Sequence, residues 1–188
     1  MSTRAWVMAF TLGLGLAGGL GCSKREAPQK LEDPEGVDST MLAFLSQARA
    51  LHHEANLKED ASDVRGARDA MQRIVDAKRP MGAEIDEVLA DACARKAELE
   101  VRLGDLQAAQ KSVTAGLGYA RQPGYFRGHM LETAGIVDEA LAKSLADAGK
   151  KNEAETAKQR ALKSLEEAIA MQAKVIERSL NVDGGSRP

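Results

Sequence analysis

The chain has 188 residues, of which 44% are hydrophobic, 29% are charged and 3% are aromatic, and its formal net charge is −2. This size and composition exclude a disordered chain and a protein with many membrane spans, and they suit one helical domain behind a short N-terminal segment. A net charge so close to zero gives no support to the binding of nucleic acid or of an anionic membrane surface.

The first element in chain order is a predicted signal peptide over residues 1–21. A cationic start that ends at Arg4 precedes an uncharged run over residues 5–21. This run is shorter than the about 20 apolar residues that a membrane-spanning helix needs, and its glycines weaken a helix further. Small residues stand immediately before Cys22, as a signal-cleaving enzyme requires.

The stretch Gly19-Leu20-Gly21-Cys22 resembles the lipobox of bacterial lipoprotein precursors. The resemblance implies that the chain is cut before Cys22, which then becomes the N-terminus and carries fatty acyl groups such as palmitate. Several acyl chains give stable anchoring in a lipid bilayer. Ser23 stands where aspartate favours retention in the inner membrane, so the resemblance implies the outer membrane, with the domain facing the periplasm. Two alternatives, an uncleaved N-terminal anchor and a cleaved signal with a spare cysteine, also place the domain outside the cytoplasm.

Residues 22–38 are predicted to form the lipidated N-terminus and a flexible tether. Pro28, Pro34 and Gly36 stand there among alternating charges, a composition that cannot build a core of its own. A segment of this length reaches about 50 Å when fully extended. The domain that follows can therefore stand away from a bilayer.

Residues 39–181 are predicted to form an all-helical domain. Apolar residues recur there at intervals of three and four, and no segment alternates for long enough to make a strand. The helix that contains Cys93 carries two apolar rows, so we expect it to pack on two sides. Residues 182–188 form a predicted disordered tail. The predicted helices cover about residues 40–58, 63–78, 83–103, 106–120, 126–148 and 152–180.

Two stretches, "VRLGDLQAAQKSVTAGL" (101–117) and "ADAGKKNEAETAKQRAL" (146–162), match each other at their glycines and alanines. They resemble the tetratricopeptide repeat, in which small side chains let paired helices approach within about 8–9 Å. The resemblance implies three helical hairpins in a tetratricopeptide-like α-α array over about residues 41–165. A plain antiparallel bundle is the alternative. The matched pairs are Gly104 with Gly149 and Ala109 with Ala154, and seven residues before each glycine Ala97 matches Ala142.

The residue types that carry chemistry give no catalytic or metal-binding pattern. His52 and His53 are neighbours, which on a helix point about 100° apart and do not form a metal-ligand pair. Cys93 stands in an apolar row and is expected to be buried and unreactive. Glu98 and Glu100 are expected to be solvent-exposed helix charges. No triad, phosphate loop or nucleotide-binding motif occurs in the sequence, so we predict no enzyme activity, cofactor or metal.

The tetratricopeptide-like array implies a candidate partner-binding face, because the first helix of each pair lines a concave groove in that family. Looser alignment suggests Arg49, His53 and Asn56 in the first pair. Charges on such a face give specificity more than affinity, and ordinary solvent-exposed side chains are the alternative interpretation. The residues that the register places on this face are Asp91, Arg95, Glu98 and Arg102 in the second pair, and Glu139, Lys143 and Asp147 in the third.

Taken together, the sequence predicts a lipoprotein of the bacterial cell envelope that acts as a protein-protein interaction scaffold or assembly factor. Its partners would be the lipid bilayer, through acylated Cys22, and another envelope protein or peptide, and not nucleic acid. A periplasmic helical-bundle carrier of a small ligand or metal is the alternative, and an unrecognised hydrolase is a third class.

Overall fold

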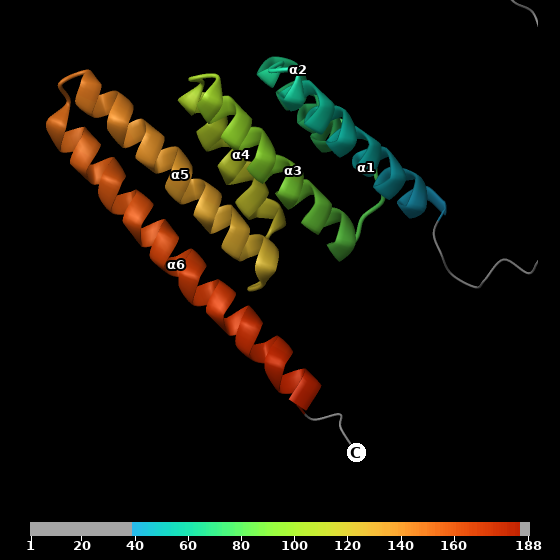
Figure 1. The fold of residues 1–188 in the computed structure, drawn as a ribbon. Coiled ribbons are helices and arrows are strands. Elements are labelled where there is room, and N and C mark those ends of the chain that lie inside the picture. The colour runs from blue at the N-terminus through green and yellow to red at the C-terminus, as the bar shows by residue number, and fades with distance from the viewer. Residues whose placement is uncertain (1–38, 185–188) are drawn as a thin grey trace, which may run out of the picture. The chain divides into compact units, whose positions relative to one another are not determined.

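The computed structural model describes residues 39–184, which all belong to one compact unit. This part of the chain forms six α-helices and contains no strand, so the all-helical prediction is confirmed (Figure 1). None of these helices is long and apolar enough to cross a membrane. The predicted signal peptide, Cys22 and the tether lie outside the described residues. The helices are α1 (Ser39–Asp60), α2 (Val64–Asp76), α3 (Ala83–Arg102), α4 (Leu106–Tyr119), α5 (Tyr125–Asp147) and α6 (Lys151–Gly184).

The C-terminal helix is longer than the sequence predicts. α6 continues to Gly184, past the expected end near residue 180 and into the predicted tail. It also begins at Lys151, one residue before the expected start. Residues 185–188 lie outside the described residues.

The six helices pair as three consecutive hairpins: α1 with α2, α3 with α4, and α5 with α6. α3 packs on both sides, against α1 and α2 and against α4 and α5, as its two apolar rows predict. Within residues 39–184 neither α1 nor α2 contacts α5 or α6. The hairpins therefore follow one another in a row and do not close into a bundle.

Glycine closes the second and third hairpins. Gly104 and Gly149 have φ of 77° and 76°, which is the left-handed region that favours glycine. Gly104 donates its N–H to the carbonyl oxygen of Val101, and the next residue, Asp105, donates to that of Glu100, each at 2.9 Å. This pair of bonds is the Schellman motif that ends helices. Asp105 then caps α4 by accepting a hydrogen bond from the N–H of Ala108 at 3.0 Å.

Small side chains lie where the helices cross. Ala97, Ala109 and Ala154 are buried, and Ala142 is half-buried. A β-carbon added to Gly135 of α5 would come within 2.6 Å of Leu165 on α6. Small residues thus lie at the close helix contacts, both alanines that the sequence match singles out and Gly135, which it does not.

The core is uneven along the row of hairpins. Large side chains such as Phe44, Leu51, Met71 and Ile74 fill the cluster that α1 and α2 form with α3. By contrast, the residues that α6 buries are all alanines, namely Ala154, Ala157, Ala161 and Ala168. Small side chains bury little apolar area, so the last hairpin keeps larger apolar side chains on its surface.

Candidate functional site

A cavity of about 290 Å³ opens between the first helices of the three hairpins, α1, α3 and α5. We call it the charged pocket, because seven of its eight lining residues are acidic, basic or histidine. Its lining residues are His52, Glu59, Asp91, Arg95, Glu98, Leu99, Arg102 and His129.

Two arginines join α3 to α1 in this pocket. Arg95 and Arg102 both donate hydrogen bonds to the Glu59 carboxylate. Arg95 also donates to Asn56 Oδ1 at 2.6 Å and to the carbonyl oxygen of His52 at 3.4 Å. The hydrogen bond from Arg95 lowers the pKa of Glu59, and Arg102 lowers this pKa further against the opposing effect of burial. Both guanidinium groups are therefore already paired with a carboxylate.

His52 also lies in the charged pocket, where its Nε2 is 3.6 Å from a carboxylate oxygen of Asp91. Burial lowers the pKa of His52 below its usual 6.5, and the Arg95 charge adds to this effect while Asp91 opposes it. The imidazole is therefore neutral at pH 7, and the Asp91 carboxylate is not matched by a full positive charge.

Glu98 is the acid of the charged pocket that has no hydrogen bond or ion pair with any residue in the described part of the chain. Burial raises the pKa of Glu98, and the nearby charges of Glu132 and Glu59 raise it further, while His129 and Arg95 lower it. With His52 neutral, the carboxylates of Glu59, Asp91 and Glu98 face the guanidinium groups of Arg95 and Arg102. Among these five groups the acids outnumber the bases by one, which favours the binding of a cation.

The structure brings together only some of the residues predicted for partner binding. Asp91, Arg95, Glu98 and Arg102 share the charged pocket. Glu139 and Lys143 line a different pocket, and Asp147 lines neither. α5 contributes its first turns to the charged pocket, through His129, and not its C-terminal half. The prediction aligns Gly149 with Gly104 and so sets residues 139–147 level with the pocket residues of α3. This holds only if successive hairpins are not shifted along their helix axes.

The contribution of α1 also differs from the expectation. Arg49 and His53 are exposed and do not line the pocket, whereas His52 and Glu59 do. On α3 the four charged lining residues recur at intervals of four, three and four. The same intervals on α1 select His52, Asn56 and Glu59, so this spacing could have identified them.

Glu100 is not the solvent-exposed charge that the sequence predicts, because only 1% of it is exposed. Its Oε1 accepts a hydrogen bond from Lys96 Nζ at 2.6 Å, and its Oε2 accepts one from Ser112 Oγ at 2.6 Å. Lys96 Nζ also donates to Ser112 Oγ at 2.8 Å. Glu98, predicted as exposed in the same way, is half-buried. The Glu100 group joins α3 to α4, so we assign it a structural role.

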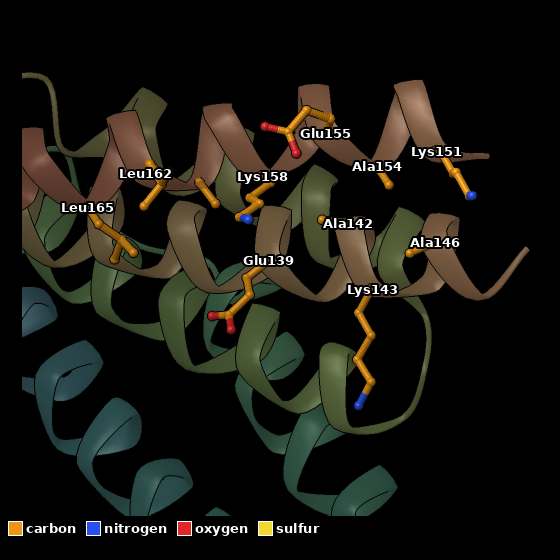
Figure 2. Close-up of a pocket in the computed structure, with 11 residues that line it drawn as sticks. Glu139, Ala142, Lys143, Ala146, Lys151, Ala154, Glu155, Lys158, Leu162 and Leu165 are labelled. Carbon is orange, nitrogen blue, oxygen red and sulfur yellow. The ribbon is translucent and has the colours of Figure 1, made fainter. Parts of the chain in front are cut away.

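A second and larger cavity, of about 610 Å³, lies between α5 and α6. We call it the terminal pocket. Its floor is apolar, formed by Ala142, Ala146, Ala154, Ala161, Leu162 and Leu165, and its rim is charged, formed by Glu139, Lys143, Lys151, Glu155 and Lys158. Figure 2 shows the side chains of Glu139 and Lys143 pointing away from α6, which leaves the alanines facing the space between the helices.

The described residues hold neither a metal cluster nor an activated thiol. No group of three His, Cys, Asp or Glu side chains in residues 39–184 is placed to hold a metal ion. Cys93 is buried as expected. Burial raises the pKa of Cys93 to about 11, so its thiol stays protonated at neutral pH and is a poor nucleophile.

Comparison of the chain with protein-family models, with curated proteins and with solved structures finds no match in any of the three.

Proposed function

We propose that this chain is a lipid-anchored scaffold of the bacterial cell envelope, whose charged pocket binds a basic side chain of a partner protein. The observation that carries the proposal is Glu98, a half-buried carboxylate in a pocket to which three hairpins contribute, with no hydrogen-bonding partner among residues 39–184. A lysine or arginine of a partner supplies the missing positive charge.

The charged pocket has room for a side chain of a partner. Its volume of about 290 Å³ lies at the lower bound of the range of about 300–1,000 Å³ that is usual for small-molecule sites. The pocket opens between helices of three consecutive hairpins, so a bound segment contacts all three. Contact with several rigid elements at once gives a scaffold its specificity.

The anchor in this proposal is Cys22, and its support comes from the sequence alone. A cysteine preceded by Gly19-Leu20-Gly21 and followed by a polar, proline-containing segment is the pattern of a lipidated N-terminus. Acylation holds the domain at a membrane surface, where an envelope partner is concentrated. Replacing Cys22 with alanine should release the domain from membranes or leave a full-length precursor, and an unchanged distribution and mobility would contradict the anchor.

The binding proposal is tested in membranes of cells that make the full chain. A photoreactive residue in place of Glu132, which lies beside His129 with 3.8 Å between the charged atoms, reports a protein bound over the pocket. Glu98→Gln keeps the shape of the side chain and removes the charge, so we expect the cross-linked product to fall at least tenfold. Glu84→Gln, an exposed change on the same helix, is the matched control.

Equal cross-linking with Glu98→Gln and with Glu84→Gln would refute the assignment of the pocket. Reversal of Arg95 or Arg102 is a poorer test, because both arginines hold Glu59 and so join α1 to α3. The anchor and the pocket are tested by different variants, so either can fail without the other.

A further inference from the structure

α6 extends well beyond the helix that it pairs with. α5 begins at Tyr125, whose carbonyl oxygen accepts a hydrogen bond from Gln172 Nε2 at 3.5 Å. After that point α6 continues to Gly184, and Figure 1 shows it running on past the start of α5. Every residue from 176 to 181 is exposed. The part of α6 that follows Gln172 is therefore an unpaired helix end within the described part of the chain.

An apolar stripe runs along this helix. Leu162, Ile169, Ile176 and Leu180 are 52%, 70%, 60% and 68% exposed. They are seven, seven and four positions apart, so they lie on one face, with the spacing of a helix-helix seam. Leu162 also lines the terminal pocket. The stripe thus continues the apolar floor of that pocket toward the C-terminal end of α6.

We propose that a second copy of this chain covers the stripe, with the two α6 helices packed antiparallel around a twofold axis at Ile169. Each protruding helix end then lies along the terminal pocket of the other copy. The same interface therefore covers the apolar stripe and the terminal pocket of both copies. This is the isologous arrangement of a twofold dimer.

The order of side chains fits this antiparallel register. Ile169 meets Ile169 of the other copy, and Leu162 meets Ile176. Leu165 meets Ala173, so a large side chain lies opposite a small one, as good packing requires. At the ends of the seam, the aliphatic stem of Lys158 covers Leu180 while its ammonium group stays in water.

Charge favours the antiparallel direction. The C-terminal end of a helix carries a partial negative charge. In the antiparallel pair this end of one α6 comes beside the α6 side of the rim of the other copy's terminal pocket, where Lys151 and Lys158 outnumber Glu155. A parallel pair would instead place these lysines beside their own counterparts and leave the two negative ends together.

The seam is long enough for a specific but reversible contact. From Lys158 to Leu180 it covers about six helical turns, or about 33 Å. Along this seam four large apolar side chains of each copy are removed from contact with water. The pairing does not depend on the proposed binding function, and it would be favoured further if two copies share a membrane surface.

Cysteine cross-linking of the full chain tests the register. Ile169→Cys should form a disulfide-linked dimer on mild oxidation, because residue 169 faces itself across the axis. Leu162→Cys should form one with Ile176→Cys when the two variants are mixed, and not with itself. Glu167→Cys, exposed on another side of the same helix, is the matched control, and the wild-type chain gives the background from Cys22 and Cys93.

Several outcomes overturn the proposal. Equal cross-linking of Ile169→Cys and Glu167→Cys would refute the proposed seam. Efficient cross-linking of Leu162→Cys with itself would show a parallel pair. A cross-link from Ile169→Cys to a different protein shows that another partner covers the stripe. As a second measurement, Ile169→Glu with Ile176→Glu should convert the dimer to a monomer in sedimentation with unchanged helical content, and a persistent dimer would refute the interface.

Discussion

Ser62 holds in the first hairpin the place that Gly104 holds in the second, and both adopt positive φ, 62° for the serine and 77° for the glycine. The turn bonds correspond as well. Ser62 donates its N–H to the carbonyl oxygen of Glu59 at 2.8 Å, and Asp63 donates to that of Lys58 at 2.7 Å. The first hairpin therefore uses the same Schellman turn as the other two, with a side chain where they have none.

Ser62→Gly should stabilise the domain by about 1 kcal/mol, because it removes the steric cost of a β-carbon in the left-handed region. Urea unfolding followed by circular dichroism measures the change. Ser62→Ala keeps the β-carbon and is the control, for which we expect no gain. If both variants unfold at the same urea concentration, backbone strain at residue 62 is not the cause.

The sequence predicts the helices well for a physical reason. Apolar residues at intervals of three and four mark each buried face directly, and Gly104 and Gly149 mark turns that few other residues can form. The first hairpin escapes the glycine match because Ser62 fills the equivalent position. The C-terminal boundary of α6 is predicted too early. The residues of α6 that extend beyond α5 are exposed, so no change from buried to exposed positions marks the point where the helix ends.

The site is predicted less well, because it depends on how helices are staggered. Asp91, Arg95, Glu98 and Arg102 lie on one face of one helix, so their grouping follows from helical geometry alone. The place of His129 in the pocket depends on where α5 starts along α3, which residue spacing within α5 does not contain. Glu100 lies two positions from Glu98, on a different side of the helix. A helix that packs on two sides could have been expected to bury it.

Gly135→Ala should destabilise the domain by about 1–3 kcal/mol, because the new β-carbon would lie 2.6 Å from Leu165 Cγ and 3.3 Å from the backbone oxygen of Ala161. α5 and α6 would have to move apart. Gly118→Ala is the matched control, since an added β-carbon there meets nothing within 4 Å. Thermal unfolding compares the two, and an equal effect at both positions would contradict close packing at Gly135.

The Glu59 network should make stability depend on pH in the acid range. The hydrogen bonds from Arg95 and Arg102 hold the pKa of Glu59 in the folded state below its usual 4.5. Its contribution is therefore complete above about pH 4.5 and is lost as the pH falls through the lowered folded-state pKa. Glu59→Gln should be less stable than the wild-type domain at pH 7 and should approach it in acid. A difference that does not vary with pH would contradict this assignment.

The effect of Glu98 on the pH dependence of stability should be opposite to that of Glu59. Burial raises the pKa of Glu98 above its usual 4.5, so the ionised form is less favoured in the folded state than in the unfolded chain. The cost is absent below about pH 4.5 and is complete above the raised folded-state pKa. Glu98→Gln should therefore be at least as stable as the wild-type domain at pH 7. A clear loss of stability would mean that Glu98 has a structural partner and would weaken its use as the binding probe.

The buried contact between Lys96 and Glu100 should show strong coupling. Lys96→Met removes the positive charge and leaves the Glu100 carboxylate, only 1% exposed, with the Ser112 hydroxyl as its remaining donor. Because an unpaired buried charge is costly, we expect a loss of about 3 kcal/mol in the free energy of unfolding.

Changing Glu100→Met as well should restore much of that loss, since two apolar side chains then replace the ion pair between α3 and α4. A double-mutant cycle from urea unfolding gives the coupling energy directly. If the single and double variants lose the same stability, Glu100 in the Lys96→Met variant reaches water or protonates at no cost. α3 and α4 would then be held together by Ala97, Ala109 and their apolar neighbours alone.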